Sequence, residues 1–553
     1  MNVQKAFLKS RKFYIISGVI LLFVAGLVYW RYYKYKLVNK KLDNLVTGKS
    51  RGLYQISYKN LFIDEAGGNI SAENVEVTAD SMVYQAMTEE HSAPQNIFYI
   101  KVPELHITGV KTPKALLNKE ISAHIIRLEN ATIEIRMARG KKENEPGLGK
   151  LMDPELYRQL LGQLKSISAD SVVLENSMLT LVDKESKKIR CKTSGLSLRF
   201  AFVAIDSVHQ KDSSRILFSK ELAVHCNQLD LPFSNKIYTL SVNGFDYNSQ
   251  TATLRTEHLA IIPALSESDF AKAHKFAKDR FNILIGSLDV KNIDRKGILN
   301  QQLLADTIQL NDASFHIFRD KSYPHDSVDR THDYPQEAIM RLDLPVFVKN
   351  IVFNRSYIEY KEKNDKSDSS GKVSFYHVQA TLSNVTNMPA YIRLNNIMRL
   401  LFKASFLNHS PFYADIRMKL NDRKGIFRLD AQLGEMNAVM LNPLVKPVAL
   451  AEMDKGKIRG LRYHLDATNT HAKGRVMLRY EDLSVKLIKK DDAKNKYKTK
   501  FFPTLAAGLL IKKSNPMNGE MRAGDVDYTR DIHRSIFHLM WKSMFTGIKK
   551  VVM

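Results

Sequence analysis

The sequence predicts a mainly β protein whose antiparallel strands each carry one apolar and one polar face. Four copies of one short pattern alternate apolar and polar residues, and further alternating stretches continue after residue 410. Strict alternation is typical of half-buried strands. With 44% hydrophobic and 25% charged residues, the chain has the composition of a folded protein that buries a core.

The repeated pattern is apolar-x-apolar-x-x-small-x-apolar-x-apolar. Its copies are IRLENATIEI (126–135), VVLENSMLTL (172–181), IQLNDASFHI (308–317) and IVFNRSYIEY (351–360). A two-residue turn at the centre, at Glu129–Asn130 in the first copy, would place the flanking residues opposite each other. Every apolar residue would then share one face of a hairpin. Asn and Asp suit tight turns, so the pattern predicts repeated hairpins.

The spacing of the copies indicates an internal duplication. Copies one and three lie 182 residues apart, copies one and two 46 apart, and copies three and four 43 apart. Regular spacing of this kind is typical of repeat architectures. We therefore expect a first β-repeat block over 51–235, a second over 236–410 and a C-terminal β region over 411–530.

A few segments have helical character between the strands. We expect short helices at roughly 152–165, 267–280, 390–405 and 442–453. In the C-terminal β region, FYADIRMKLNDRKGIFRLDAQL (412–433) alternates and then turns at NDRKG, as two strands joined by a turn would.

The N-terminal region predicts a membrane anchor. FYIISGVILLFVAGLVYW (13–30) lacks charged residues and as a helix would be roughly 27 Å long, close to the thickness of a bilayer core. It is longer than the apolar core of a usual signal peptide, and no small-x-small cleavage site follows, so we expect a retained transmembrane helix. Residues 1–12 form a basic N-terminal segment and 31–50 a basic juxtamembrane linker. Basic residues on both sides nearly balance, which leaves the orientation open. Trp30, Tyr32 and Tyr33 are expected to contact the membrane interface.

The C-terminal segment 531–553 predicts an amphipathic basic helix. Lys542 lies mid-segment, where burial at a bilayer centre would cost about 2.5–3.5 kcal/mol, so a spanning helix is disfavoured. The helix could lie on a membrane, dock on a partner, or pack on its own domain. The residues expected to contact a membrane are Ile536, Phe537, Met540, Trp541, Phe545, Lys542, Lys549 and Lys550.

Charge and cysteine content narrow the functional classes. The net charge is +25, of which residues 1–50 and 486–553 contribute +9 each. Because these basic ends also hold the apolar segments, attraction to anionic lipid is expected and nucleic-acid binding is not. Cys191 and Cys226 are expected to be small buried hydrophobes, with a disulfide in an oxidising compartment as the open alternative.

No motif points to catalysis. The sequence contains no phosphate-binding loop, dinucleotide-binding glycine pattern or nucleophile elbow. YPHDSVDRTHDYPQE (323–337) holds residue types that bind metals, but without a tight zinc spacing, and is predicted to be a solvated loop between strands. We therefore expect no enzymatic activity, no cofactor and no metal site.

Strands with one apolar face must bury that face. A second sheet, closure into a barrel, covering helices, or an open curved sheet that holds lipid would each do so. Alternation alone does not choose among these four solutions.

The N-terminal anchor, the opening LYQISYKNLFIDEAGGNISAENVEVTAD (53–80), the repeated hairpins and the ending NPMNGEMRAGDVDYTRDIHRSIFHLMWKSMFTGIKK (515–550) resemble one family. The chain is similar to AsmA-like proteins of Gram-negative envelopes, within the wider group of repeating β-groove, bridge-like lipid transfer proteins. The resemblance implies an elongated, curved antiparallel sheet, a β-taco or groove, with a single-pass inner-membrane helix and the bulk of the chain in the periplasm.

The resemblance also implies a function. The groove would bind phospholipid acyl chains and help lipid transport between inner and outer membranes, or outer-membrane homeostasis. The C-terminal helix would contact the outer membrane or an envelope protein. A non-transporting scaffold that affects outer-membrane protein assembly is the alternative. The residues expected to line the groove are Ile126, Leu128, Ile133, Ile135, Val172, Leu174, Leu179, Leu181, Ile308, Leu310, Phe315, Ile317, Ile351, Phe353, Ile358 and Tyr360.

Overall fold

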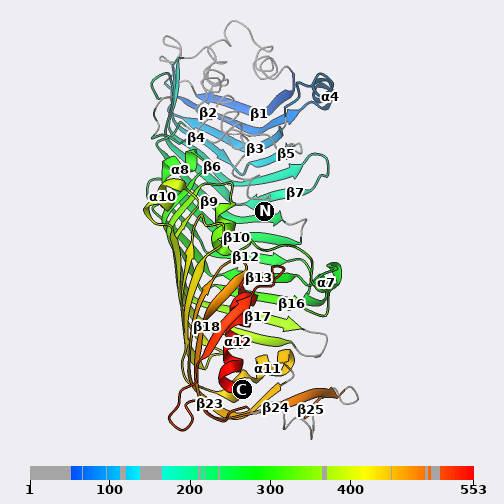
Figure 1. Ribbon diagram of the computed structural model, residues 1–553. Helices are drawn as coiled ribbons and strands as arrows, with labels where there is room; N and C mark the ends of the chain where they lie inside the picture. The colour runs from blue at the N-terminus through cyan, green and yellow to red at the C-terminus, as the bar shows by residue number, and fades with distance from the viewer. Residues whose placement is uncertain are drawn as a thin grey trace. The chain divides into compact units, whose positions relative to one another are not determined.

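The computed structural model divides into two compact units. Figure 1 shows that both are built mainly of strands, with a few helices. The structure describes residues 52–64, 66–94, 96–111, 120–137, 165–209, 212, 214–216, 218–233, 237–363, 370–449, 451–491, 496–499 and 511–553. Described residues up to 259 and residues 291–303 belong to the first unit, and residues 260–290 and 304–553 to the second. The predicted mainly β fold is confirmed.

The described part of the first unit is a sheet with two short helices. Its helices are α4 (Ser81–Glu89) and α8 (Arg295–Leu299). Its strands are β1 (Tyr54–Asp64), β2 (Asn69–Ala79), β3 (Asn96–Thr108), β4 (Glu120–Glu129), β5 (Thr132–Met137), β6 (Ser166–Asp183), β7 (Ile189–Ser194), β8 (Leu196–Ile205), β9 (Glu221–Phe233), β10 (Tyr238–Asn248) and β11 (Thr253–Thr256). The chain passes between the units within β12 (His258–Pro263) and β14 (Ser287–Lys291), and again at the start of β15.

Among the described residues, the second unit has more helices than the first. Its strands are β13 (Asp279–Ile285), β15 (Leu303–Asn311), β16 (Ser314–Asp320), β17 (Val346–Lys363), β18 (Gly371–Thr386), β19 (Ile397–Phe406), β20 (Ser410–Lys419), β21 (Phe427–Leu433), β22 (Met436–Asn437), β23 (Ala451–Ala467), β24 (His471–Asp491), β25 (Lys496–Thr499) and β26 (Gly524–Thr529). Its helices are α7 (Glu267–Ala273), α9 (Pro335–Met340), α10 (Pro389–Leu394), the 3-10 helix η3 (Ala438–Leu441), α11 (Asn442–Ala449) and α12 (Ile536–Val552).

Strand pairing in the first unit is mixed, not purely antiparallel as predicted. β1, β2 and β3 pair antiparallel in chain order. β4 and β5 then both lie between β3 and β6, antiparallel to β3 and parallel to β6. These two elements therefore run end to end, as one interrupted strand. β7 and β8 likewise both pair with β6 on one side and β9 on the other.

The hairpin turn predicted at Glu129–Asn130 is wrong, because the chain does not reverse there. Leu128 and Ala131 are both buried, at 3% and 1% exposure, with two residues between them instead of one. The interrupted strand continues through Asn130, which is in the left-handed region at φ 54°, and its register with β3 and β6 does not shift there. An additional left-handed residue within a strand and a two-residue hairpin leave the same gap between apolar residues on one face, so the sequence pattern fits both.

All four copies of the pattern contain such a left-handed residue, and in copies two and four the strand register also shifts there, against β8 and β18. The left-handed residues are Asn130, Asn176, Asp312 and Arg355, with φ between 44° and 54°. Asn and Asp tolerate this conformation better than most residues. The small residue that follows in each copy is 1% exposed: Ala131, Ser177, Ala313 and Ser356. Copies one and two lie side by side in parallel register, as do copies three and four for their second halves.

The second unit continues from this parallel pair into an antiparallel series. β16 pairs with β13 on one side and runs parallel to β17 on the other. From β17 to β20, each strand then pairs with the next one, and β21 pairs with β23. β24 pairs with β23 and with β26. The strands and turn predicted over 412–433 are confirmed.

The predicted helices are partly correct. α7 and α11 confirm the starts predicted at 267 and 442, but α7 ends at Ala273 and α11 at Ala449. The helix predicted over 390–405 is wrong, since α10 ends at Leu394 and residues 397–406 form β19. Pro389 begins the short helix, while the alternation in IMRLLFKASF pairs with neighbouring strands on both sides. Residues 152–164 and the predicted anchor 13–30 lie outside the described residues. No helix within the described ranges is long and apolar enough to cross a membrane.

Candidate functional site

In the first unit, the predicted groove residues form a packed core. Leu128 lies beside Leu174, and Ile133 beside Leu179, in parallel register. All eight predicted positions are at most 8% exposed. They are Ile126, Leu128, Ile133, Ile135, Val172, Leu174, Leu179 and Leu181. The protein itself covers these side chains, so the structure offers a ligand little surface there.

In the second unit, the equivalent residues are more accessible. Leu310 is 9% exposed, whereas the other seven predicted positions are half-buried. The seven are Ile308, Phe315, Ile317, Ile351, Phe353, Ile358 and Tyr360. The same sequence pattern therefore gives a closed core in one unit and a partly uncovered apolar surface in the other.

Strand register arranges part of this surface into rows. Ile283, Phe315 and Ile358 lie opposite one another across β13, β16 and β17. Two residues further along the strands, Phe281, Ile317 and Tyr360 form the next row. Residues two apart in a strand share a face. We call these six residues the apolar lane.

An aromatic cluster on β18 to β20 extends the first row. Phe375 pairs with Ile358 on one side and with Phe406 on the other. Its ring centroid lies 5.2 Å from that of Phe412 and 5.5 Å from that of Phe402. The repeated pattern did not identify these residues or Phe281 and Ile283. The alternation in FNILI (281–285) and FYADI (412–416) is the sequence signal that locates them.

A polar row ends the apolar lane. This row lies two positions along the strands from the second row of the lane, on the same face. It consists of Asp279, Arg319 and Glu362. Arg319 Nε lies 2.8 Å from Asp279 Oδ1, and Lys321 Nζ lies 2.6 Å from Glu362 Oε2. Burial raises the pKa of the Asp279 carboxyl, against the opposing effect of Arg319. Burial also raises the pKa of the neighbouring Tyr360 hydroxyl.

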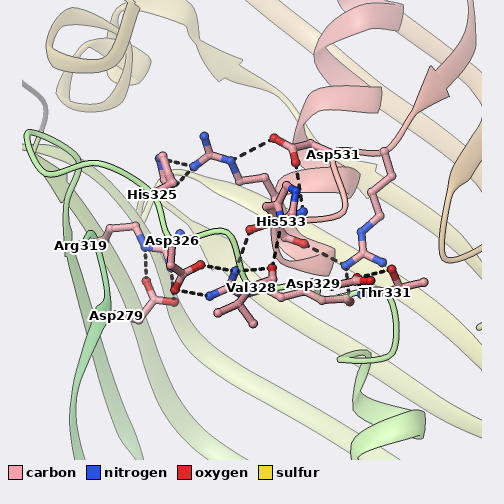
Figure 2. A network of polar contacts seen from close by, with 12 residues as sticks. Asp279, Arg319, His325, Asp326, Val328, Asp329, Thr331, Asp531 and His533 are labelled. Carbon is pink, nitrogen blue, oxygen red and sulfur yellow. Dashed lines mark hydrogen bonds and ion pairs between the residues drawn. The ribbon is translucent and has the colours of Figure 1, made fainter. Parts of the chain in front are cut away.

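The connection from β16 to β17 crosses toward the C-terminal segment. Because β16 and β17 are parallel, residues 321–345 must pass over the sheet. Arg330 Nη1 donates hydrogen bonds to Asp326 and, at 2.9 Å, to the carbonyl of His533. Figure 2 shows this network, with His325 and Asp326 beside Asp279 and Arg319.

This connection is more ordered than the solvated loop that the sequence predicts. Tyr334 is fully buried and donates a 3.0 Å hydrogen bond to the carbonyl of Thr468. The Arg530 guanidinium stacks on the Tyr334 ring and donates to the carbonyls of Asn469 and Arg330. The segment thus ties the β23–β24 turn to the start of α12. Among the described residues, no group of three or more His, Cys, Asp or Glu residues could hold a metal ion.

Helix α12 packs one face on its own sheet, against β24 and β26 (Figure 1). Its buried residues are Ile536, Leu539, Ser543, Gly547 and Val551. The helix approaches the sheet closely, because a Cβ at Gly547 would lie 2.5 Å from Val476 Cγ2. Tyr463 and Arg522 donate hydrogen bonds to the carbonyls of Met540 and Val551. Packing on its own domain, one of the three sequence alternatives, therefore occurs.

The opposite face of α12 remains exposed. Phe537, Trp541 and Phe545 are 70%, 40% and 39% exposed, and Lys542, Lys549 and Lys550 are exposed beside them. Met540 is half-buried. Ile536, which the sequence placed among the membrane contacts, is only 7% exposed because it faces the sheet. The amphipathic pattern did not predict that the small residues Ser543 and Gly547 would lie on the face that packs against the sheet.

The two cysteines are not joined by a disulfide. Cys191 and Cys226 are both free and buried, and burial raises the pKa of both thiols. Trp30, Tyr32 and Tyr33 lie outside the described residues.

No protein-family model matches the chain, and a search among curated proteins finds no significant match.

Proposed function

We propose that this chain is a membrane-anchored periplasmic protein that binds phospholipid acyl chains and helps lipid transport between inner and outer membranes, or outer-membrane homeostasis. The observation that carries the proposal is the contrast between the two units. The eight apolar positions are packed in the first unit, whereas seven of the eight equivalent positions are half-buried in the second. Acyl chains would therefore lie on the second unit, along the apolar lane and its aromatic extension.

Physical chemistry supports this choice of ligand. Removing apolar surface from water contributes about 25 cal/mol per Å², so a chain of methylenes gains from any continuous apolar strip. The lane and aromatic cluster provide six hydrophobic or aromatic residues in two rows and at least four further phenylalanines. Larger exposed apolar patches on a protein commonly mark binding sites. The mechanism requires no catalytic residue.

The exposed face of α12 supports the membrane part of the proposal. Phe537, Trp541 and Phe545 recur every four residues on the face opposite the sheet. Aromatic rings with neighbouring lysines suit the boundary between acyl chains and anionic headgroups. We propose that this face contacts the outer membrane or an envelope protein while the other face stays docked.

A non-transporting envelope scaffold is the second candidate. The packed apolar face of the first unit favours it, since a filled interior transmits no lipid. The two functions differ in the second unit. A scaffold needs no lipid on the apolar lane, whereas the lipid-binding proposal requires it.

Photocrosslinking tests the proposal. A photoreactive amino acid replaces Phe315, which faces the lane, in the full chain. The matched control carries it at His316, the next residue, which faces the other side of β16 and has a side chain 40% exposed. The proposal predicts phospholipid adducts from position 315 and few from 316. Equal labelling at both positions, or none at 315, contradicts it.

A further inference from the structure

The apolar lane ends at one side in a concentration of basic groups. Lys321 follows Arg319 by two residues, and the side chain of Arg534 contacts the His325 ring. The side chains of Lys321 and Arg534 are 31% and 22% exposed. These residues come from β16, its crossover connection and the segment before α12, so three separate parts of the second unit contribute to one place.

Two histidines at this place, His325 and His538, have several basic side chains nearby. Burial and the charges of Arg534, Arg319 and Lys321 lower the pKa of His325 to about 4. Burial and the charges of Arg534, Lys542 and Lys321 lower the pKa of His538 to about 4 as well. In both cases most of the nearby charges are positive.

Carboxylates also lie at this place. Glu362 pairs with Lys321, Asp279 with Arg319, and Asp531 with Arg534 at 3.3 Å. Each of these three cations thus has one carboxylate partner. The Nδ1 atom of His538 is buried and has no hydrogen-bond partner within the described part of the chain. A phosphate placed here would share Lys321 and Arg534 with their carboxylates through charge-assisted hydrogen bonds.

We propose that Lys321, His325, Arg534 and His538 bind a phosphate ester at the end of the apolar lane. The inference rests on the proposed function and deepens it. A phospholipid whose chains lie on Phe281, Ile317 and Tyr360 would place its phosphate beyond the second row of the lane, where the basic groups lie. The polar end would then hold lipid in one orientation, with chains on the apolar rows and the headgroup toward α12.

Two fluorescent probes with identical chains test the site. The full chain, held in solution by an amphipol, is titrated with labelled phosphatidic acid and with labelled diacylglycerol, which lacks the phosphate. Glycerol phosphate, which lacks the chains, is titrated separately by calorimetry. The test variant is Lys321→Gln combined with Arg534→Gln. The control is Arg475→Gln, since Arg475 pairs with Asp525 at an exposed position elsewhere in the same unit. Circular dichroism checks that both variants remain folded.

The proposal predicts that wild type and control prefer phosphatidic acid over diacylglycerol by about tenfold, equivalent to about 1.4 kcal/mol. The double variant loses this preference but still binds diacylglycerol. Weak binding of glycerol phosphate identifies a lipid headgroup as the source, whereas binding as tight as that of phosphatidic acid identifies a free phosphate ester. Equal binding of both lipids by wild type, or an unchanged preference in the double variant, overturns the site.

The same titrations separate this inference from the proposed function. If diacylglycerol and phosphatidic acid both fail to bind, the lipid proposal fails. Glycerol phosphate then decides the site alone: binding that the double variant abolishes supports it, and no binding by wild type overturns it.

Discussion

The side-chain amide of Asn176 donates a 2.8 Å hydrogen bond to Oδ1 of Asn130 in the neighbouring parallel strand. Both residues are left-handed and occupy the same position of the repeated pattern. The two left-handed residues therefore lie side by side, and Ser177 Oγ accepts a 3.0 Å hydrogen bond from the amide of Ala131 next to them. Because both strands carry the left-handed residue at the same level, their apolar residues stay on one face.

Substitution of Asn130 tests the importance of this conformation. A β-branched residue is strained at positive φ, so Asn130→Val is expected to destabilise the first unit by about 1–2 kcal/mol. Asn130→Gly is expected to cost much less, because glycine adopts positive φ freely. Thermal unfolding of the two variants measures the difference. Equal midpoints for both would contradict a conformational role.

The contrast between the units predicts different responses to a buried charge. Leu128→Asp places a carboxyl in the packed core and is expected to destabilise the protein by about 3 kcal/mol or more. Phe315→Asp places it on the half-buried lane, where water can reach it, and is expected to cost less stability. Urea denaturation gives the stabilities, and probe titration gives lipid binding. The lipid-binding account requires Phe315→Asp to stay folded and lose lipid; a folded variant with normal loading refutes it.

The close packing of α12 makes a specific prediction at Gly547. A larger side chain there meets Val476, so Gly547→Leu is expected to release the helix from β24 and β26. Lys549→Leu changes an exposed position of the same helix and serves as the control. Hydrogen exchange of residues 536–552 should accelerate in the first variant alone. Unchanged protection in Gly547→Leu would contradict the docked arrangement.

Trp541 provides a reporter for membrane contact. The chain has two tryptophans, so Trp30→Phe leaves Trp541 as the only one. Anionic vesicles are expected to shift its emission to the blue, and salt or Lys542→Glu with Lys549→Glu to reduce the shift. Vesicles of zwitterionic lipid are the control. Emission that does not respond to anionic vesicles argues against a membrane and favours a protein partner.

Acidification is expected to weaken the contact between the crossover connection and α12. His325 and His538 have pKa values of about 4 in the folded protein, below the ordinary histidine value of about 6.5. The unfolded chain therefore binds more protons between these values, so stability falls as pH drops from about 6.5 toward 4. The facing charges are Arg319, Lys321, Arg534 and Lys542, with Asp326 and Asp531 opposing them. Thermal unfolding at pH 7 and pH 5 should show the loss, and His538→Asn should reduce it. An equal loss in that variant would exclude His538 as a contributor.

The sequence predicts the strands well because alternation records which face is buried, as in 412–433. It does not distinguish a left-handed residue within a continuing strand from a hairpin at Glu129–Asn130, since both leave the same spacing. Nor does it reveal that Leu128 is packed while Phe315 is half-buried, because exposure depends on what covers the sheet. The docked face of α12 escaped prediction for a related reason. Ser543 and Gly547 are small, and only their contact with the sheet gives them their role.

The sequence also did not predict the basic groups at the polar end of the lane. Lys321 and Arg534 are more than 200 residues apart, and only strand register and the crossover connection bring them to one place. The Asp and His residues of 323–337 are of types that bind metals, but Asp326, Asp333 and His325 contact arginines. Asp329 accepts hydrogen bonds from Thr331, and His332 lies 3.1 Å from Glu337. Arg330 binds Asp326, and Arg341 binds Asp333.

Native mass spectrometry of the purified full chain, with identification of the lipids released, tests the central claim most directly. The account predicts phospholipid that co-purifies in stoichiometric amount with wild type and with Arg475→Gln, and that is lost from folded Phe315→Asp. Protein without bound lipid, or phospholipid retained equally by Phe315→Asp, would contradict it.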